Sequence, residues 1–182
     1  MSYSSRYINI IDLEATCRED KQWPPDQEQE VIEIGLAVVD TTSKEIEETV
    51  SFLIEPICGE VTDFCTELTS LTEPQLRKHG MTLGSACRRL KDKYQSHQRP
   101  WGSWGNWDLN RFQKDCQMKG VGYPMNTTHF NIKTLFAMGH GLGNEMGLGS
   151  ACNYAMDGFE GTHHRGVDDA RNTAMLFIDL FS

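Results

Sequence analysis

The chain has 182 residues, of which 38% are hydrophobic and 24% charged, and its formal net charge is −9 at pH 7. This length allows one compact domain over residues 1–182 and is too short for two ordinary domains. The acidic balance argues against proteins that wrap a duplex through many lysines and arginines, and no apolar run reaches the roughly 18 residues that span a bilayer, so we expect no membrane partner.

The N-terminal third of the chain predicts three strands. Residues 7–14 form a buried strand that ends in acidic residues, and residues 31–40 form a second strand whose apolar side chains alternate. A polar loop, residues 18–30, separates these two strands, and a short turn leads to a third strand at residues 48–55. Neighbouring strands with such connections favour an antiparallel meander.

Helical patterns dominate the middle of the chain. Thr72 is expected to cap a helix that ends at Gly80. Apolar residues then recur at helical spacing over residues 83–94. A short aromatic stretch, residues 100–107, is expected to be a strand, and a further helix is expected to begin at Asp108.

The C-terminal third predicts two more helices, at residues 131–138 and 167–181. Between them, residues 139–149 contain five glycines without the spacing of a phosphate-binding loop, so we expect a flexible surface segment. Strands followed by a mixture of strand and helices indicate an α/β sheet covered by helices. The meander argues against a purely parallel sheet.

Two carboxylates close the first strand. Because residues two apart in a strand share a face, Asp12 and Glu14 line up with Ile8 and Ile10. Two like charges at the end of an apolar face oppose each other's ionisation, and a divalent cation that prefers oxygen ligands, Mg²⁺ or Mn²⁺, removes this opposition. The alternative is a strand that ends at Leu13 and leaves Glu14 in solvent.

A third acid, Asp108, follows a tryptophan-rich stretch at residues 101–107 and precedes a helix. Aspartate is a favoured N-cap residue, so helix capping alone explains its position. The three tryptophans of this stretch are suited to form the wall of a site beside the carboxylate. Packing in the core explains these tryptophans equally well.

The segment HHRGVDD, residues 163–169, opens the last helix. Asp168 fits a first helical turn, where the helix dipole favours acids, whereas Asp169 heads an apolar seam and needs a partner. His164 lies in the loop just before the helix, where an imidazole with an ordinary pKa of about 6.5 accepts a proton from water near neutral pH. We assign no role to His163.

The order of these residues is more specific than any one of them. Asp-x-Glu on a first strand, a third acid before a mid-chain helix and His-x₄-Asp at the last helix resemble the DEDDh exonuclease superfamily, the ribonuclease T and DNA polymerase III epsilon-like group. Five segments are similar to the enhanced-RNAi and histone-mRNA 3′-exonuclease branch: DLEATC (12–17), VIEIGLAVVD (31–40), DFCTELTSLT (63–72), GNWD (105–108) and HRGVDDARNTA (164–174).

The resemblance implies a ribonuclease H-like fold, with a mixed five-stranded sheet flanked by helices. It implies a 3′→5′ exonuclease that releases nucleoside 5′-monophosphates by a two-metal-ion mechanism, with the ions about 4 Å apart. In that mechanism His164 is the general base, and two divalent cations are held by Asp12, Glu14, Asp108 and Asp169. The resemblance further implies that the backbone around Ala15 and Thr16 holds the terminal nucleotide, and that Leu68 lies against its base.

The expected partner is single-stranded or 3′-overhanging nucleic acid, with RNA favoured over DNA because the resembling branch acts largely on RNA. Three alternatives stay open: a DNA exonuclease of the proofreading or repair type, a hydrolase of small nucleotides, and a non-catalytic nucleic-acid-binding domain. RNA is distinguished from DNA through the 2′-hydroxyl, and no residue of the sequence identifies that contact. The sequence neither requires nor excludes a protein partner.

The cysteines bear on the location of the protein. They form no CxxC pair, which argues against a disulfide framework and a structural zinc site. The first residues lack the apolar core of a secretory signal. We therefore expect a cytoplasmic protein with six reduced thiols, at Cys17, Cys58, Cys65, Cys87, Cys116 and Cys152.

Overall fold

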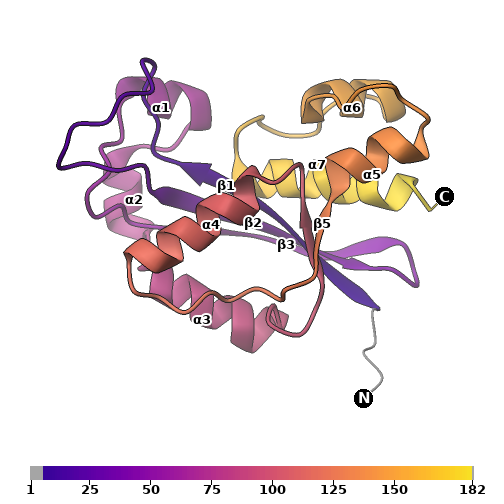
Figure 1. The fold of residues 1–182 in the computed structure, drawn as a ribbon, viewed down its shortest axis with the longest axis horizontal. Helices are drawn as coiled ribbons and strands as arrows, with labels where there is room; N and C mark the ends of the chain where they lie inside the picture. The colour runs from indigo at the N-terminus through magenta and orange to yellow at the C-terminus, as the bar shows by residue number, and fades with distance from the viewer. Residues whose placement is uncertain (1–5, 182) are drawn as a thin grey trace.

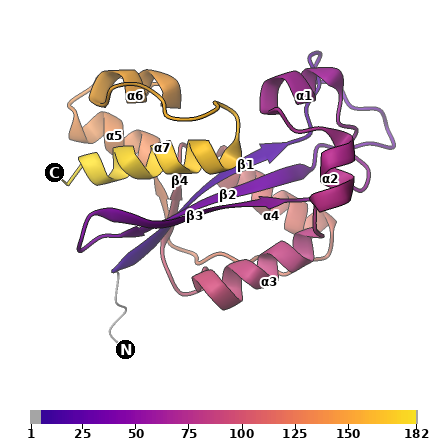
Figure 2. The same ribbon diagram turned by 180° about the vertical axis from the view of Figure 1, so that it is seen from behind.

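The computed structural model describes residues 6–181, and its strands form one mixed sheet (Figures 1 and 2). The strands are β1 (Tyr7–Ala15), β2 (Val31–Asp40), β3 (Glu45–Leu53), β4 (Trp101–Ser103) and β5 (His129–Asn131). Their order across the sheet is β3-β2-β1-β4-β5. β1, β2 and β3 pair antiparallel, whereas β4 pairs parallel with both β1 and β5. The mixed five-stranded sheet expected from the sequence is confirmed.

Helices cover both faces of this sheet. Within the described residues they are α1 (Asp63–Thr69), α2 (Glu73–His79), α3 (Leu83–Tyr94), α4 (Trp107–Met118), α5 (Ile132–Gly139), α6 (Leu148–Ala155) and α7 (Gly166–Asp179). α3 and α4 lie on one face, and α7 lies on the other with α5 and α6 beside it (Figures 1 and 2). No helix of residues 6–181 is both long and apolar enough to cross a bilayer.

Most elements follow the sequence pattern, and three short ones are not predicted from it. β3 begins at Glu45, three residues before the predicted start, because the alternation of side-chain exposure begins there. The pattern does not predict β5, which has three residues, or α1 and α6, which have seven and eight. Elements this short contain too few turns or alternations for the apolar period alone to identify them, and the equally short α2 is predicted from its Thr72 cap instead.

Alternate residues of β1 belong to two different cores. Ile11 and Leu13 pack with α3 and α4, whereas Ile8 and Ile10 pack with α7. Because side chains alternate along a strand, the residues that continue the second set are Asp12 and Glu14. The two carboxylates therefore face the side of the sheet that α7 covers.

The N-terminal end of α7 makes a very close contact with β2. A Cβ atom added to Gly35 would lie 1.9 Å from the carbonyl oxygen of Gly166 and 2.4 Å from the amide nitrogen of Val167. Both neighbours are backbone atoms, which cannot rotate away. Glycine at residue 35 thus lets the start of α7 lie directly on the sheet, and this contact fixes Asp169 over the end of β1.

Replacing Gly35 with alanine is expected to push α7 away from the sheet. Overpacking at a rigid contact costs roughly 1–3 kcal/mol, and we expect the free energy of unfolding to fall by at least that amount. Urea denaturation measures the change. Gly143→Ala is the matched control, because a Cβ atom there meets no atom within 4 Å. A Gly35→Ala protein as stable as the Gly143→Ala protein would contradict the close contact.

A buried network of charges ties α4 to the start of β2. Asp115 and Glu30 are fully buried, and Lys119 Nζ lies 2.8 Å from Glu30 Oε1 and 3.9 Å from Asp115 Oδ2. Asp115 also pairs with Arg111 and accepts a hydrogen bond of 2.7 Å from the Val31 amide. Buried charges persist when they are paired and hydrogen-bonded. The network holds α4, and with it Asp108, in a fixed position relative to the sheet.

The glycine-containing segment 139–149 is more ordered than the sequence suggests. Leu142 and Met146 pack against the cluster between α5, α6 and α7, and the Met146 carbonyl accepts a hydrogen bond of 3.1 Å from Trp104 Nε1. Leu148 is buried and begins α6. Most of residues 142–149 lie at the surface, as expected, but the side chains of Leu142, Met146 and Leu148 anchor the segment despite its glycines.

Candidate active site

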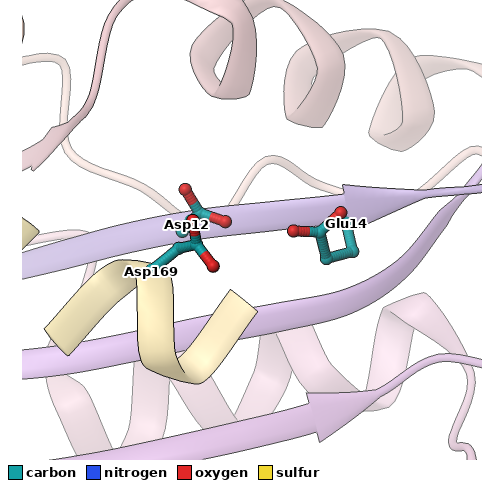
Figure 3. A group of neighbouring side chains, drawn as sticks. All are labelled: Asp12, Glu14 and Asp169. Carbon is teal, nitrogen blue, oxygen red and sulfur yellow. The ribbon is translucent and has the colours of Figure 1, made fainter. Parts of the chain in front are cut away.

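Three carboxylates meet where the end of β1 lies against α7. Asp12 and Glu14 come from β1, and Asp169 comes from the first turn of α7. One oxygen atom from each side chain lies within 4.8 Å of the others. Figure 3 shows the Asp169 carboxylate facing Asp12, with Glu14 further along the same strand. The sequence spacing and the contact between α7 and β2 together produce this cluster.

Asp108 reaches the same place from the opposite face of the sheet. It lies in the first turn of α4 and is 5% exposed. Its Oδ1 accepts a hydrogen bond of 2.9 Å from the Leu13 amide, between Asp12 and Glu14 in the chain. Asn106, not Asp108, occupies the N-cap position. The capping explanation for Asp108 is therefore wrong, and its carboxylate is instead bonded to the strand that carries the other acids.

An open cavity of about 400 Å³ joins these residues. All five residues that the resemblance implies in catalysis line it, together with Ala15 and Leu68. Thr16 does not line it. Thr16 is fully buried, its amide donates to the Glu30 carbonyl at 2.8 Å, and its hydroxyl accepts from the Glu30 amide at 2.9 Å. The amide and the hydroxyl of Thr16 thus form hydrogen bonds that join the two ends of the loop between Thr16 and Glu30.

Two histidines lie at the α7 side of the cavity. His163 and His164 both line it, and their rings meet edge to face with centroids 4.1 Å apart. His163 Nε2 lies 3.7 Å from Asp169 Oδ1, a proximity that the sequence does not indicate. His164 has a φ of +64°, which turns the chain into α7. Asp168 does not enter the cavity, because its Oδ2 accepts a hydrogen bond of 2.9 Å from the Thr162 amide and secures the loop.

A comparison with protein families identifies this arrangement. Residues 10–177 match the RNase T family model, described as exonuclease. The chain belongs to the RNase T exonuclease family. The 3'-5' exoribonuclease 1 of Homo sapiens is 28% identical over 185 residues, which cover 96% of this chain and 52% of that protein. The probable 3'-5' exonuclease KapD of Bacillus subtilis (strain 168) is 27% identical over 169 residues, which cover 92% of this chain and 81% of that protein.

Solved structures agree with this membership. The nuclease domain of 3'hExo, described as a DEDDh family member bound to rAMP, matches with a TM-score of 0.85 and 26% identity. The match covers 100% of this chain and 94% of that chain. The ribonuclease H-like fold of the RNase T exonucleases is therefore confirmed for this chain. The chain spans about half the length of the human exoribonuclease that it resembles.

Burial raises the pKa of every carboxyl group in this RNase T exonuclease site. The pKa of Glu14 is raised to about 9, first by burial and then by the charges of Asp169 and Glu33. The pKa of Asp12 is raised well above its ordinary value by burial and by Asp108. Burial also raises the pKa of Asp108 to about 6 and that of Asp169 to about 7. Without a counter-charge, the four carboxyl groups therefore resist ionisation.

The residues present fit divalent cations, which the DEDDh relatives imply. Carboxylate oxygens are the ligands that hard cations such as Mg²⁺ and Mn²⁺ prefer. Asp169 Oδ2 is buried and has no hydrogen-bond partner among residues 6–181. An unpaired buried acceptor is costly unless a cation or donor satisfies it. The site thus has both the donor set and the unsatisfied oxygen that a cation requires.

The raised pKa values predict that the metal-free site lowers the stability of the protein by an amount that depends on pH. A folded protein whose acids have raised pKa values binds more protons than its unfolded chain, so these acids lower stability as pH rises from about 4 toward 9. In EDTA, Glu14→Gln should therefore raise the melting temperature, and its advantage over the unmodified protein should grow between about pH 5 and pH 8. Adding Mg²⁺ should stabilise the unmodified protein more at the higher pH. An advantage that stays constant with pH would contradict the raised pKa of Glu14.

A further carboxylate, Glu33, holds the beginning of α7 and was missed in the sequence. It is fully buried on β2, directly opposite Glu14 in the strand pairing. Its Oε2 accepts hydrogen bonds of 3.0 Å from the Gly166 amide and 3.2 Å from Arg165 Nε, and its Oε1 accepts one of 2.6 Å from Ser51. The sequence contains one signal for this role. Glu33 is an acid in the apolar interior of the strand VIEIGLAVVD, where a charged side chain needs a buried partner.

Proposed function

We propose that this chain is a metal-dependent 3′→5′ exoribonuclease that releases nucleoside 5′-monophosphates. The observation that carries the proposal is the convergence of four carboxylates and a loop histidine on one open cavity. We assign the cation ligands as Asp12, Glu14, Asp108 and Asp169, and the general base as His164. Membership of the RNase T exonuclease family supports the reaction class.

Two divalent cations, Mg²⁺ or Mn²⁺, would supply Lewis-acid activation of the attacking water and charge neutralisation at the leaving 3′-oxygen. The chain's own residues supply the rest. The carboxylates of Asp12, Glu14 and Asp169 lie within 4.8 Å of one another and give a concentrated negative site for the cations. The Leu13 amide orients Asp108, and Glu33 fixes the start of the helix that carries Asp169.

His164 is suited to accept the proton of the attacking water. Burial and the neighbouring His163 lower the pKa of His164 below its ordinary value. A lowered pKa keeps the imidazole neutral near pH 7, which is the form that accepts a proton. Ala15 and Leu68 line the same cavity, and we assign the Ala15 backbone and the Leu68 side chain to the terminal nucleotide. Thr16 is left out of this assignment because its amide and hydroxyl are already bonded to Glu30.

The names of related proteins support RNA as the substrate. The human relative is named an exoribonuclease, and the matching nuclease domain contains rAMP, a ribonucleotide. The Bacillus subtilis relative is named only an exonuclease, so a DNA substrate is the alternative. We further propose that residues 1–182 act as one domain in a cytoplasmic setting, which six free thiols support.

Digestion of matched oligonucleotides tests the proposed function. RNA and single-stranded DNA of the same sequence, labelled at the 5′ end, are incubated with Mg²⁺, Mn²⁺ or EDTA. We expect a ladder that shortens from the 3′ end, depends on the cation and forms faster on RNA. A faster reaction on DNA would move the assignment to a DNA exonuclease. Cleavage of dinucleotides without a ladder would indicate a hydrolase of small nucleotides, and no cleavage of any substrate would contradict catalysis.

A further inference from the structure

A second cavity adjoins the one that contains the carboxylates. It measures about 470 Å³, compared with about 400 Å³ for the first. The two cavities share four lining residues, so they form one continuous depression: Cys17, Gln29, Leu68 and Trp107. The other lining residues come from α1 and from the loop between β1 and β2. A ligand with one end at the carboxylates can therefore extend directly into the second cavity.

The second cavity is lined by large apolar side chains that the fold leaves exposed. Trp107 is 48% exposed, Phe64 is 37% exposed and Leu68 is 36% exposed. Trp23, from the loop between β1 and β2, is half-buried and lines the cavity with them. Aromatic side chains grouped around a cavity bind flat rings by stacking, and they do so with little dependence on which base is bound.

The loop that carries Trp23 is held at both ends. The Thr16 amide donates to the Glu30 carbonyl at 2.8 Å, and the Glu30 amide donates to Thr16 Oγ1 at 2.9 Å. Trp23 precedes two prolines, Pro24 and Pro25, and a residue before proline is restricted to extended conformations. A wall that is already restricted loses less conformational freedom when a ligand binds. The position of Trp23 is thus suited to a binding role.

Three charged residues of the loop between β1 and β2 also line the second cavity: Arg18, Glu19 and Lys21. Arg18 NH1 lies 2.7 Å from Glu60 Oε2, and Arg18 Nε lies 3.8 Å from Asp20, so its charge is already paired. Glu19 opposes an anion, whereas the exposed Lys21 is suited to meet a neighbouring phosphate. The base is the part of a nucleotide that fits the apolar side chains of the cavity.

We propose that Trp23 forms a wall of the pocket that receives the base of the 3′-terminal nucleotide. This inference rests on the proposed function, because it takes the phosphate end of that nucleotide to lie at the carboxylates. The base then lies in the second cavity against Leu68, Phe64 and Trp107, and Trp23 stacks on it from the loop. Trp23 is in this sense a specificity residue for the presence of a base, not for its identity.

Binding of a single nucleotide tests this role without turnover. The affinities of AMP and of ribose 5-phosphate, which lacks the base, are measured by calorimetry with Ca²⁺ for the unmodified protein and for Trp23→Ala. Stacking of one base on an aromatic side chain is worth roughly a tenfold change in affinity or more. We therefore expect Trp23→Ala to lower the affinity for AMP by about that factor. Ribose 5-phosphate should bind both proteins equally, and Trp23→Phe should retain most of the AMP affinity.

Tyr154→Ala is the matched control, since Tyr154 is 54% exposed on α6 and lines neither cavity. Equal AMP affinity of Trp23→Ala and the control would overturn the role of Trp23 while leaving the proposed function intact. A loss of affinity that Trp23→Ala shows only for longer oligonucleotides would also overturn this role, because it would assign Trp23 to an upstream nucleotide. If the unmodified protein binds AMP no better than ribose 5-phosphate, the base pocket itself is wrong. Failure of the proposed function shows separately, as an absence of metal-dependent digestion.

Discussion

Asp12→Asn is expected to lower kcat/KM on RNA by about 10³-fold or more, because cations at such a site contribute several kcal/mol to the transition state. The substitution keeps the size of the side chain and removes one negative charge from the cluster with Glu14 and Asp169. Calorimetry should show weaker binding of Mn²⁺. In EDTA the variant should melt at a higher temperature. The loss of one carboxylate removes the cost of burying a charge and the repulsion between like charges in the metal-free protein.

Asp92→Asn is the matched control for this variant. Asp92 is exposed on α3, on the face of the sheet opposite α7, and lines none of the cavities around the carboxylates. The Asp92→Asn protein should retain the activity, the metal affinity and the melting temperature of the unmodified protein. An Asp12→Asn protein with the activity of this control would show that Asp12 holds no cation.

Removal of the imidazole of His164 gives the second large effect. His164→Ala should lower kcat by about 10²- to 10⁴-fold, the usual contribution of a positioned general base, while Mn²⁺ affinity changes little. The unmodified protein should lose activity as pH falls through the pKa of His164, since only the neutral imidazole accepts a proton. That pKa lies below the ordinary value, so activity should still be near its maximum at pH 7. The variant should lack this limb of the pH profile.

His163→Ala separates the two neighbouring histidines. His163 Nε2 lies 3.7 Å from Asp169 Oδ1, so its loss should affect the carboxylate it faces more than the proton transfer. We expect His163→Ala to keep most of kcat and to retain the limb of the pH profile, shifted toward higher pH because His163 no longer lowers the pKa of His164. If instead His163→Ala removed the pH limb and His164→Ala kept it, the general base would be His163. Loss of Mn²⁺ binding in His164→Ala would make His164 a ligand.

The sequence predicts the parts of this site that follow from regular periods. Two-residue spacing in a strand puts Asp12 and Glu14 on one face, and the helical seam of the last helix turns Asp169 inward. All three side chains lie where these periods direct them, in the cavity at the junction of β1 and α7. The meander and the long helices follow from the same periods.

Contacts between distant segments are not visible in such periods. Gly35 matters because the backbone of Gly166 packs against it. Glu33 matters because Arg165 and Gly166 donate hydrogen bonds to it, and both lie at least 132 positions further along the chain. The position of Trp23 depends on hydrogen bonds that close a loop without regular structure. In each case the partner is set by tertiary packing, which a local pattern cannot encode.

The chemistry of the released product tests the proposed reaction directly. RNA is digested with Mn²⁺ in water enriched in oxygen-18, and the products are analysed by mass spectrometry. We expect nucleoside 5′-monophosphates that carry one oxygen-18 atom on phosphorus, released from the 3′ end. We expect none with EDTA and about 10³-fold less or lower with Asp12→Asn. Release of nucleoside 3′-phosphates or cyclic phosphates, or equal release by the Asp12→Asn protein, would contradict it.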